Sequence, residues 1–297
     1  MVINSFTRVS APDWFDAGTL AGFADEKDHG VPYIKQYNYL GSQFEFRRSE
    51  PWRDDDAGGF GASRADYETT VIAGNTFDYP AVHGQAILDA GFSFTSSSVK
   101  AVENGTAQLT GYMAVDLIAG KQKLTKVGRG AVPDKYRLFT PALTAALASY
   151  ARNGGNILLS GAYVATDVWD NGNIDAGAAN FAKNIMGYEF LTGQATRHGN
   201  VYTVQSPYSA LREGKHYAFA TELNSDIYAA ESPDAIKPAD ERGATIARYT
   251  ENNIPAGIAV DAGNYRTVVY GFPIETVTDP AQRADIIGSA LNFFKKQ

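Results

Sequence analysis

Short apolar runs alternate along this chain with segments in which apolar residues recur at helical spacing. A run that is apolar at consecutive positions, such as Ile157-Leu158-Leu159, is typical of a strand buried on both faces of a parallel sheet. Comparable short runs fall at residues 2–6, 70–74, 92–94, 114–118 and 267–273. The alternation predicts a three-layer α/β sandwich, in which helices cover both faces of a mostly parallel sheet.

Three longer segments are predicted to be helices, at residues 81–90, 140–152 and 280–294. In the second, Leu143, Leu147 and Tyr150 fall on one face, and Pro141 stands where the first turn of a helix tolerates proline. Gly154-Gly155 then ends this helix just before the central strand. We expect the apolar faces of these helices to pack on the sheet.

Two regions break the alternation. Residues 10–66 are rich in Gly, Asp, Tyr and Phe, have little periodicity, and are too long for a simple connection, so we expect an irregular insertion there. Residues 188–262 contain short alternating stretches between turn residues, which predict antiparallel strands added to one edge of the sheet. With no internal repeat and no low-complexity linker, residues 1–297 are expected to form a single α/β domain.

Composition narrows the classes of function. The net charge of -7 and the scattered Lys and Arg argue against nucleic acid as a partner. The chain contains no cysteine, so disulfides, thiolate metal sites and a cysteine nucleophile are excluded. No apolar run approaches the roughly 20 residues that span a bilayer, and Met1–Phe6 does not resemble a signal peptide.

The carboxyl end of the central strand is the first place to look for chemistry, because open α/β sheets hold ligands there. Ser160 at this end is a candidate nucleophile, with His83 as its base and Asp78 beside that histidine. The G-x-S-x-G pattern of a nucleophile elbow is absent around Ser160. The alternative is structural: Ser160 satisfies backbone groups at a strand end, and Asp78 and His83 cap the following helix.

Other side chains follow predicted strands and can share the same rim. Asp167 and Glu275 are a candidate carboxylate pair for glycoside cleavage, which depends on their separation in space. Asn75, Tyr79, Tyr163 and Trp169 are candidate ligand-binding residues, since aromatic rings stack on sugars. The alternative for these aromatic residues is ordinary packing.

Two oxygen-rich loops are candidate metal sites, and neither has a recognised spacing. Asp54-Asp55-Asp56 fits no calcium-loop spacing, and residues 167–175 lack the glycine and the distal glutamate of an EF-hand. Solvated charge or pairing with nearby arginines is favoured for the first loop. We therefore expect no metal and no cofactor.

Three segments, residues 66–80, 153–167 and 271–275, make the chain resemble the α/β module of Bacteroidetes cell-envelope proteins known as xanthan lyases. The resemblance covers most of the chain. In those proteins the module lies beside golvesin-type or amidase-like domains, which implies a fragment of a larger extracytoplasmic protein, periplasmic or at the cell surface, with flanking domains as partners.

The sheet pattern also resembles the flavodoxin-like and class I glutamine-amidotransferase-like folds, including the non-catalytic version in the trimerisation domain of some β-galactosidases. Catalytic amidotransferases place a cysteine in their elbow, and this chain has none, which excludes that chemistry. The resemblance implies an accessory or binding module directed at polysaccharide or peptidoglycan. The alternatives are a hydrolase or lyase of glycans or their esters acting through Ser160, His83 and the rim carboxylates, and a structural module for domain contacts or oligomerisation.

Overall fold

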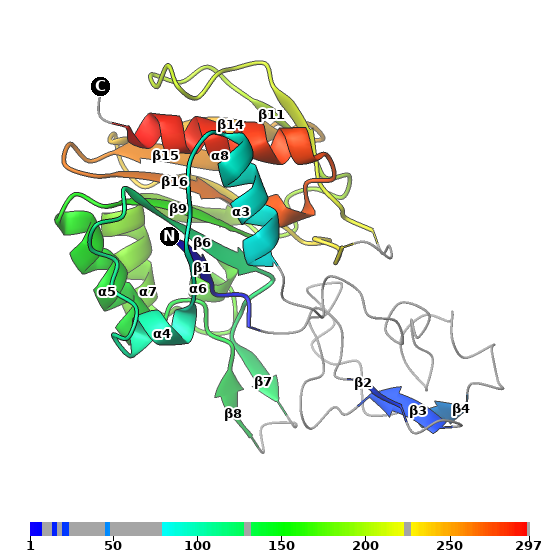
Figure 1. Cartoon of the computed structure of the whole chain (residues 1–297). Helices are drawn as coiled ribbons and strands as arrows, with labels where there is room; N and C mark the ends of the chain where they lie inside the picture. The colour runs from blue at the N-terminus through cyan, green and yellow to red at the C-terminus, as the bar shows by residue number, and fades with distance from the viewer. Residues whose placement is uncertain are drawn as a thin grey trace.

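A computed structural model describes residues 1–7, 14–16, 20–23, 45–47, 79–127, 132–222 and 227–295 (Figure 1). The predicted strand at 70–74, the candidate residues Asn75 and Asp78, and the Asp54–Asp56 loop lie outside the described residues. Most of the expected insertion at 10–66 lies outside them too. Within it, β2 (Trp14–Asp16), β3 (Leu20–Phe23) and β4 (Glu45–Arg47) form a small antiparallel sheet.

One half of the nine-stranded central sheet is parallel. In chain order its strands are β1 (Val2–Asn4), β5 (Ser96–Ser98), β6 (Ala114–Gly120), β9 (Asn156–Gly161) and β16 (Arg266–Tyr270). In space they run β5-β1-β6-β9-β16. Numbered along the chain, this order is 2-1-3-4-5, the flavodoxin-like order, whose switch point lies between the first and third strands. The α/β fold class predicted from sequence is confirmed.

The other half of the sheet is antiparallel and comes from the region predicted to add strands. Beside β16 lie β15 (Pro255–Asp261), β14 (Gly243–Tyr249), β11 (Asn200–Thr203) and β12 (His216–Ala218) in that order. A separate pair is formed by β10 (Tyr188–Thr192) and β13 (Ala235–Pro238), and β7 (Thr125–Val127) pairs with β8 (Val132–Lys135). The antiparallel addition at 188–262 is therefore present as expected.

Helices cover both faces of the sheet (Figure 1). On one face α3 (Tyr79–Asp89) packs on α8 (Pro280–Phe294), above a core that includes Leu158 and Val268. The other face carries α4 (Val99–Glu103), α5 (Pro141–Arg152) and α7 (Ala176–Phe181) over a second core, while the short α6 (Thr166–Trp169) follows β9. The helices predicted at 140–152 and 280–294 are observed, and α3 begins two residues before the predicted start.

The strand predicted at 92–94 is not formed. Residues 92–95 are irregular, and the strand beside β1 is instead the polar run Ser96–Ser98. Phe92 and Phe94 pack as partly buried side chains against the core beneath α3. A strand at the sheet edge has only one neighbour and does not need to be apolar, which is why serines can form it.

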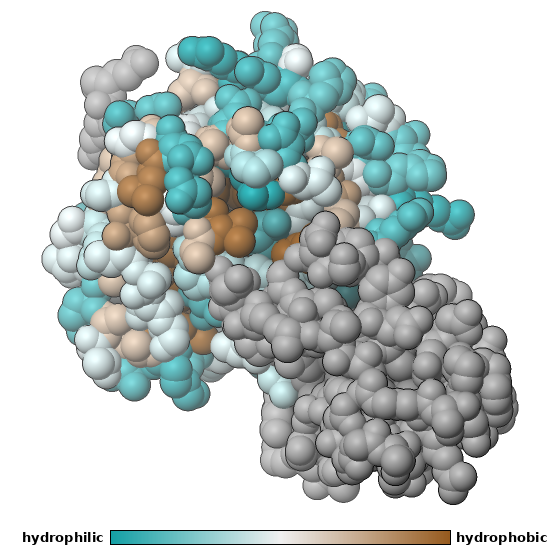
Figure 2. All heavy atoms as spheres, turned by 45° about the vertical axis from the view of Figure 1, so that its right-hand side comes forward, coloured by the Kyte–Doolittle hydropathy of each residue, from teal (hydrophilic) through white to brown (hydrophobic). Residues whose placement is uncertain are grey.

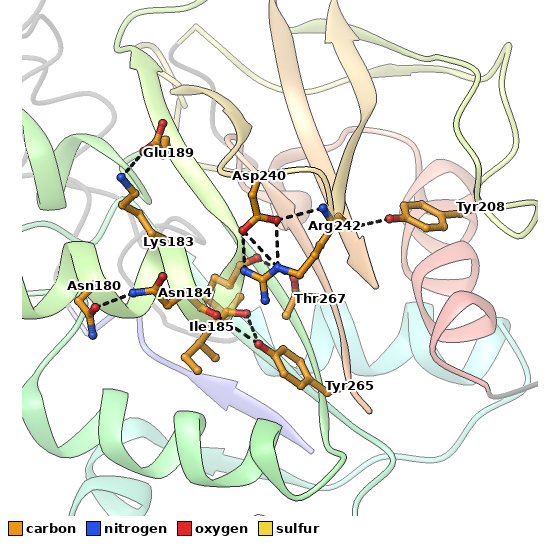
Figure 3. Close-up of polar contacts among 11 residues, drawn as sticks. Asn180, Lys183, Asn184, Ile185, Glu189, Tyr208, Asp240, Arg242, Tyr265 and Thr267 are labelled. Carbon is orange, nitrogen blue, oxygen red and sulfur yellow. Dashed lines mark hydrogen bonds and ion pairs between the residues drawn. The ribbon is translucent and has the colours of Figure 1, made fainter. Parts of the chain in front are cut away.

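A π-helical turn, η3 (Ala182–Met186), follows α7 and is fastened to the start of β16 (Figure 3). The Tyr265 hydroxyl donates to the carbonyl oxygen of Ile185 at 3.1 Å, and the Thr267 hydroxyl donates to that of Met186 at 2.7 Å. These bonds satisfy carbonyls that the end of a helix leaves without an internal partner. They hold the helical layer to the sheet.

Hydrophilic residues make up much of the described surface in Figure 2, with smaller groups of hydrophobic residues among them. In the described part of the chain, the exposed large hydrophobic side chains are those of Leu88, Met113, Ile174 and Leu191. None of the helices there has both the length and the apolar character needed to cross a membrane.

Candidate functional site

A buried cluster of ionisable side chains joins α3 to the sheet. His83 of α3 lies between two carboxylates: its Nδ1 is 2.7 Å from Asp116 Oδ2, and its Nε2 is 3.3 Å from Glu275 Oε2. Asp116 belongs to β6, and Glu275 lies in the 3-10 turn η4 (Ile274–Thr276) after β16. The Tyr228 hydroxyl donates to the other oxygen of Glu275 at 2.7 Å. None of the four residues is more than 4% exposed. We call them the His83 cluster.

The carboxylates determine the charge of the imidazole. Burial alone lowers the pKa of His83, but the charge and hydrogen bond of Asp116, together with those of Glu275, outweigh burial and raise the pKa to about 10. At neutral pH the ring is therefore an imidazolium that donates from both nitrogens. A general base needs a nitrogen without a proton, so His83 in this state cannot accept one.

Two aromatic rings, those of Phe6 and Tyr79, pack against Tyr228 of the His83 cluster. The ring of Tyr79 lies 5.5 Å from that of Phe6 and 5.5 Å from that of Tyr228, between ring centroids. Tyr79 is 0% exposed. This candidate ligand-binding residue therefore lies in the core.

Asp167, expected to share the rim with Glu275, is engaged elsewhere. Its carboxylate accepts backbone N–H bonds from Leu124 at 2.6 Å and from Leu138 at 2.9 Å. Burial raises the pKa of Asp167, although these hydrogen bonds oppose the rise. The carboxylate ties the segments before β7 and after β8 to α6. The structure thus brings Glu275 into contact with His83. Asp167 contacts neither of these two residues.

Asp175, the last residue of the oxygen-rich loop, has a structural role. Asp175 accepts from the backbone N–H groups of Gly177 and Ala178 and so caps α7. The ring of Trp169 meets that of Tyr188 edge to face, 5.8 Å between centroids. Within the described residues, no group of three or more His, Asp and Glu side chains is arranged to hold a metal ion.

Ser160 lies in β9 and is 0% exposed. Its hydroxyl and Asp116 Oδ1 are buried without a hydrogen-bond partner in the described part of the chain. The pairing of Asp116 with Leu158, and of Ile118 with Ser160, makes Asp116 and Ser160 diagonal neighbours on one face of the sheet. Ser160 therefore faces the same side as the His83 cluster, but it forms no hydrogen bond with His83.

One segment, residues 227–234, is tied to the carboxyl ends of three parallel strands. Tyr228 binds Glu275 beyond β16, as described above. Glu231 accepts two bonds from Lys121 Nζ beyond β6, at 2.8 and 3.0 Å, and the lysine is 1% exposed. Asp234 accepts the backbone N–H groups of Ala165 and Thr166 beyond β9, both at 2.7 Å. We call this segment the rim strap.

The switch point between β1 and β6 is also bridged by the chain itself. Thr7 donates its backbone N–H to Gln122 Oε1 at 3.1 Å, and Gln122 Nε2 donates to the Thr7 hydroxyl at 3.1 Å. Nearby, Lys123 Nζ lies 4.7 Å from the ring centroid of Tyr163, which is 4% exposed. Contacts among the described residues thus cross this end of the sheet, where open α/β sheets hold ligands.

Sequence reasoning missed Asp116, Tyr228, Lys121 and Glu231. A signal existed for Asp116, a single carboxylate within the apolar run Ala114–Ile118. A charge in a strand buried on both faces needs a partner, and the histidines are the obvious candidates. No comparable local signal marks the residues of the rim strap.

Comparisons with known proteins give no family. No family model matches the chain, and no curated protein matches it by sequence. Among solved structures, a cytoplasmic protein of Salmonella typhimurium is 13% identical, covers 72% of this chain and 86% of its own, and has a TM-score of 0.46.

Two further structures are similar at the same level. A GMP synthase-type protein from Thermoplasma acidophilum is 10% identical over 75% of this chain and 92% of its own, with a TM-score of 0.42. A β-galactosidase of Halorubrum lacusprofundi is 16% identical over 73% of this chain, with a TM-score of 0.43. The chain spans about a quarter of that galactosidase, 26% of its length. These values are too low to assign a family.

Proposed function

We propose that this chain is a non-catalytic α/β module that binds polysaccharide or peptidoglycan as an accessory part of a larger extracytoplasmic protein. The proposal that the module is non-catalytic is supported by one observation. His83 is enclosed between Asp116 and Glu275. Both ring nitrogens are committed to carboxylates, and the side chain is 0% exposed. The histidine best placed to act as a base is thus occupied as a structural cation.

The other candidate catalytic groups support the same proposal. Asp167 binds backbone N–H groups, and Ser160 is buried in a strand without a bond to His83. Hydrolysis through a serine needs a nucleophile within hydrogen-bond reach of its base, at a position that substrate can enter. The described residues do not meet these conditions, which weighs against the alternative of a glycan hydrolase.

The ligand class rests on the resemblance to envelope proteins and is tested directly. The chain is applied to an array of neutral and anionic polysaccharides and to purified peptidoglycan, and each bound material is then analysed for new reducing ends or released esters. The proposal expects saturable binding to at least one glycan and recovery of that glycan intact. Binding to none of them would refute the binding function, and products that disappear in a Ser160→Ala variant would favour the hydrolase.

A further inference from the structure

Two hollows lie next to each other at the amino ends of the parallel strands, the end of the sheet opposite the rim strap. One has a volume of about 570 Å³ and lies beside the start of β16, and the other, of about 660 Å³, lies between the loop before β6 and the end of α5. Both are lined by Asn156, Phe294 and Lys295, so they adjoin there. We call them together the amino-end groove. Each hollow has the size of a small-molecule site.

Polar groups in the groove offer both hydrogen-bond donors and acceptors. Ser209 and Asn292 line the first hollow, both are exposed, and neither side chain forms a hydrogen bond with the described part of the chain. The amide nitrogen of Asn264 donates to the carbonyl oxygen of Arg152 at 3.0 Å, and its amide oxygen has no hydrogen-bond partner among the described residues. Hydroxyl and amide groups both donate and accept, as the hydroxyls of a sugar require.

The charged side chains of the groove already have partners. Arg266 Nε is 2.9 Å from Asp261 Oδ2, and its guanidinium also donates to the carbonyl oxygen of Phe293 at the end of α8. Lys295 Nζ lies 4.4 Å from the ring centroid of Phe92. A phosphate or carboxylate ligand would have to compete with these contacts, so the lining favours an uncharged molecule.

Apolar surface in the groove is held in place. The Tyr208 hydroxyl donates to the carbonyl oxygen of Arg242 at 2.8 Å, and the Arg242 guanidinium is bound by Asp240 (Figure 3). The Tyr208 ring lies 4.7 Å from that of Phe293, between centroids. In the second hollow, Met113 is 40% exposed. A fixed ring beside neutral polar groups suits the alternating CH faces and hydroxyls of a saccharide.

We infer that the amino-end groove binds a neutral oligosaccharide whose units occupy both hollows. The inference rests on the proposed function, because it assigns the site and the chemical class of that glycan ligand. It places the ligand away from the carboxyl-end rim, where the rim strap and the Thr7–Gln122 pair bind across the ends of the parallel strands.

The test is calorimetric titration of the whole chain with cellohexaose, xylohexaose and maltohexaose, and with hexagalacturonate as an anionic probe. Asn292→Trp fills the first hollow and Thr110→Trp the second, since both residues are exposed and line the groove. Asn173→Trp is the matched control, an exposed asparagine outside the groove. We expect a neutral hexaose to bind, each groove variant to bind at least about tenfold more weakly, and the control to stay within about twofold.

The outcomes separate the inference from the proposed function. A neutral hexaose that binds both groove variants as tightly as the unaltered chain overturns the inference and leaves the proposed function standing. Binding of hexagalacturonate without binding of any neutral hexaose also overturns the inference and leaves the proposed function standing. Failure of all four probes overturns the inference, and the glycan array then decides the proposed function by itself. Melting curves of the two groove variants show that any loss of binding is not a loss of fold.

Discussion

His83 Nδ1 lies 2.7 Å from Asp116 Oδ2, and this contact joins the middle of α3 to β6, the middle strand of the parallel half of the sheet. The two side chains are 0% and 4% exposed. A buried charge that loses its partner is costly, whereas a well-packed pair of charges is close to neutral. The pair therefore fixes where α3 sits, and it makes stability depend on the proton of His83.

Stability is expected to fall as the solution becomes alkaline. The pKa of His83 is raised from 6.5 to about 10 in the folded chain, so the folded state keeps a proton that the unfolded state loses. This contribution is complete below pH 6.5 and is lost as the pH rises towards 10, at no more than about 1.4 kcal/mol per pH unit. Urea unfolding at a series of pH values measures it. His83→Gln should remove the slope, and His216→Gln, at an exposed histidine, should keep it.

Asp116→Asn is expected to lower the free energy of unfolding by about 3 to 5 kcal/mol, the usual cost of removing one member of a buried ion pair. The reason is that, within the described part of the chain, the imidazolium of His83 keeps Glu275 as its one remaining counter-charge. Chemical denaturation measures the difference. Glu213→Gln, at an exposed carboxylate, is the control and should change little. A loss below about 1 kcal/mol for Asp116→Asn would mean that the cluster is not a buried ion pair.

Ser160→Ala is expected to leave the free energy of unfolding unchanged or to raise it by about 1 kcal/mol. The hydroxyl is buried without a hydrogen-bond partner in the described part of the chain. Burying such a group costs the free energy of removing it from water, and no hydrogen bond in the folded state offsets that cost. Thermal denaturation, compared with Ser209→Ala on the surface, measures the effect. A clear loss of stability would show that the hydroxyl has a partner, such as a water shared with Asp116 Oδ1.

Lys121→Met is expected to destabilise the chain by about 3 to 5 kcal/mol, because the Glu231 carboxyl, whose pKa is raised by burial, would lose the lysine that binds it. Lys237→Met removes a lysine that is half exposed and pairs with Glu189, and should cost less than about 1 kcal/mol. Adding Glu231→Leu to Lys121→Met should recover part of the loss. Equal effects of the two lysine substitutions would argue against a rim strap held by a buried ion pair.

The fold was predictable where both faces of a strand are buried, because the sequence then has to be continuously apolar. Ile157-Leu158-Leu159 in β9 is such a case. The edge strand Ser96–Ser98 was not predictable, since it has one neighbour and no apolar requirement, while the adjacent Phe92 and Phe94 supply apolar contacts without forming a strand. The pattern of apolar residues along the chain indicates which strands are buried on two faces, but it does not indicate which segment pairs at the edge of the sheet.

The candidate site was predictable only in part. His83 and Glu275 were both candidates, but their contact joins residues 192 positions apart and depends on how α3 lies over the sheet. The same is true of Lys121 and Glu231, which are 110 positions apart. No periodicity along the chain encodes such distances. A lone Asp in a buried strand does indicate that a partner exists, although it does not say which one.

The most direct test of the central claim, that His83 is a structural cation rather than a base, is an NMR titration of its imidazole. Nitrogen shifts of selectively labelled histidine are followed from pH 6 to pH 9, with labelled free histidine as the reference. We expect both ring nitrogens of His83 to stay protonated throughout this range, while free histidine loses its proton within it. A His83 ring that loses its proton near pH 7 would contradict the account and return this histidine to the candidates for catalysis.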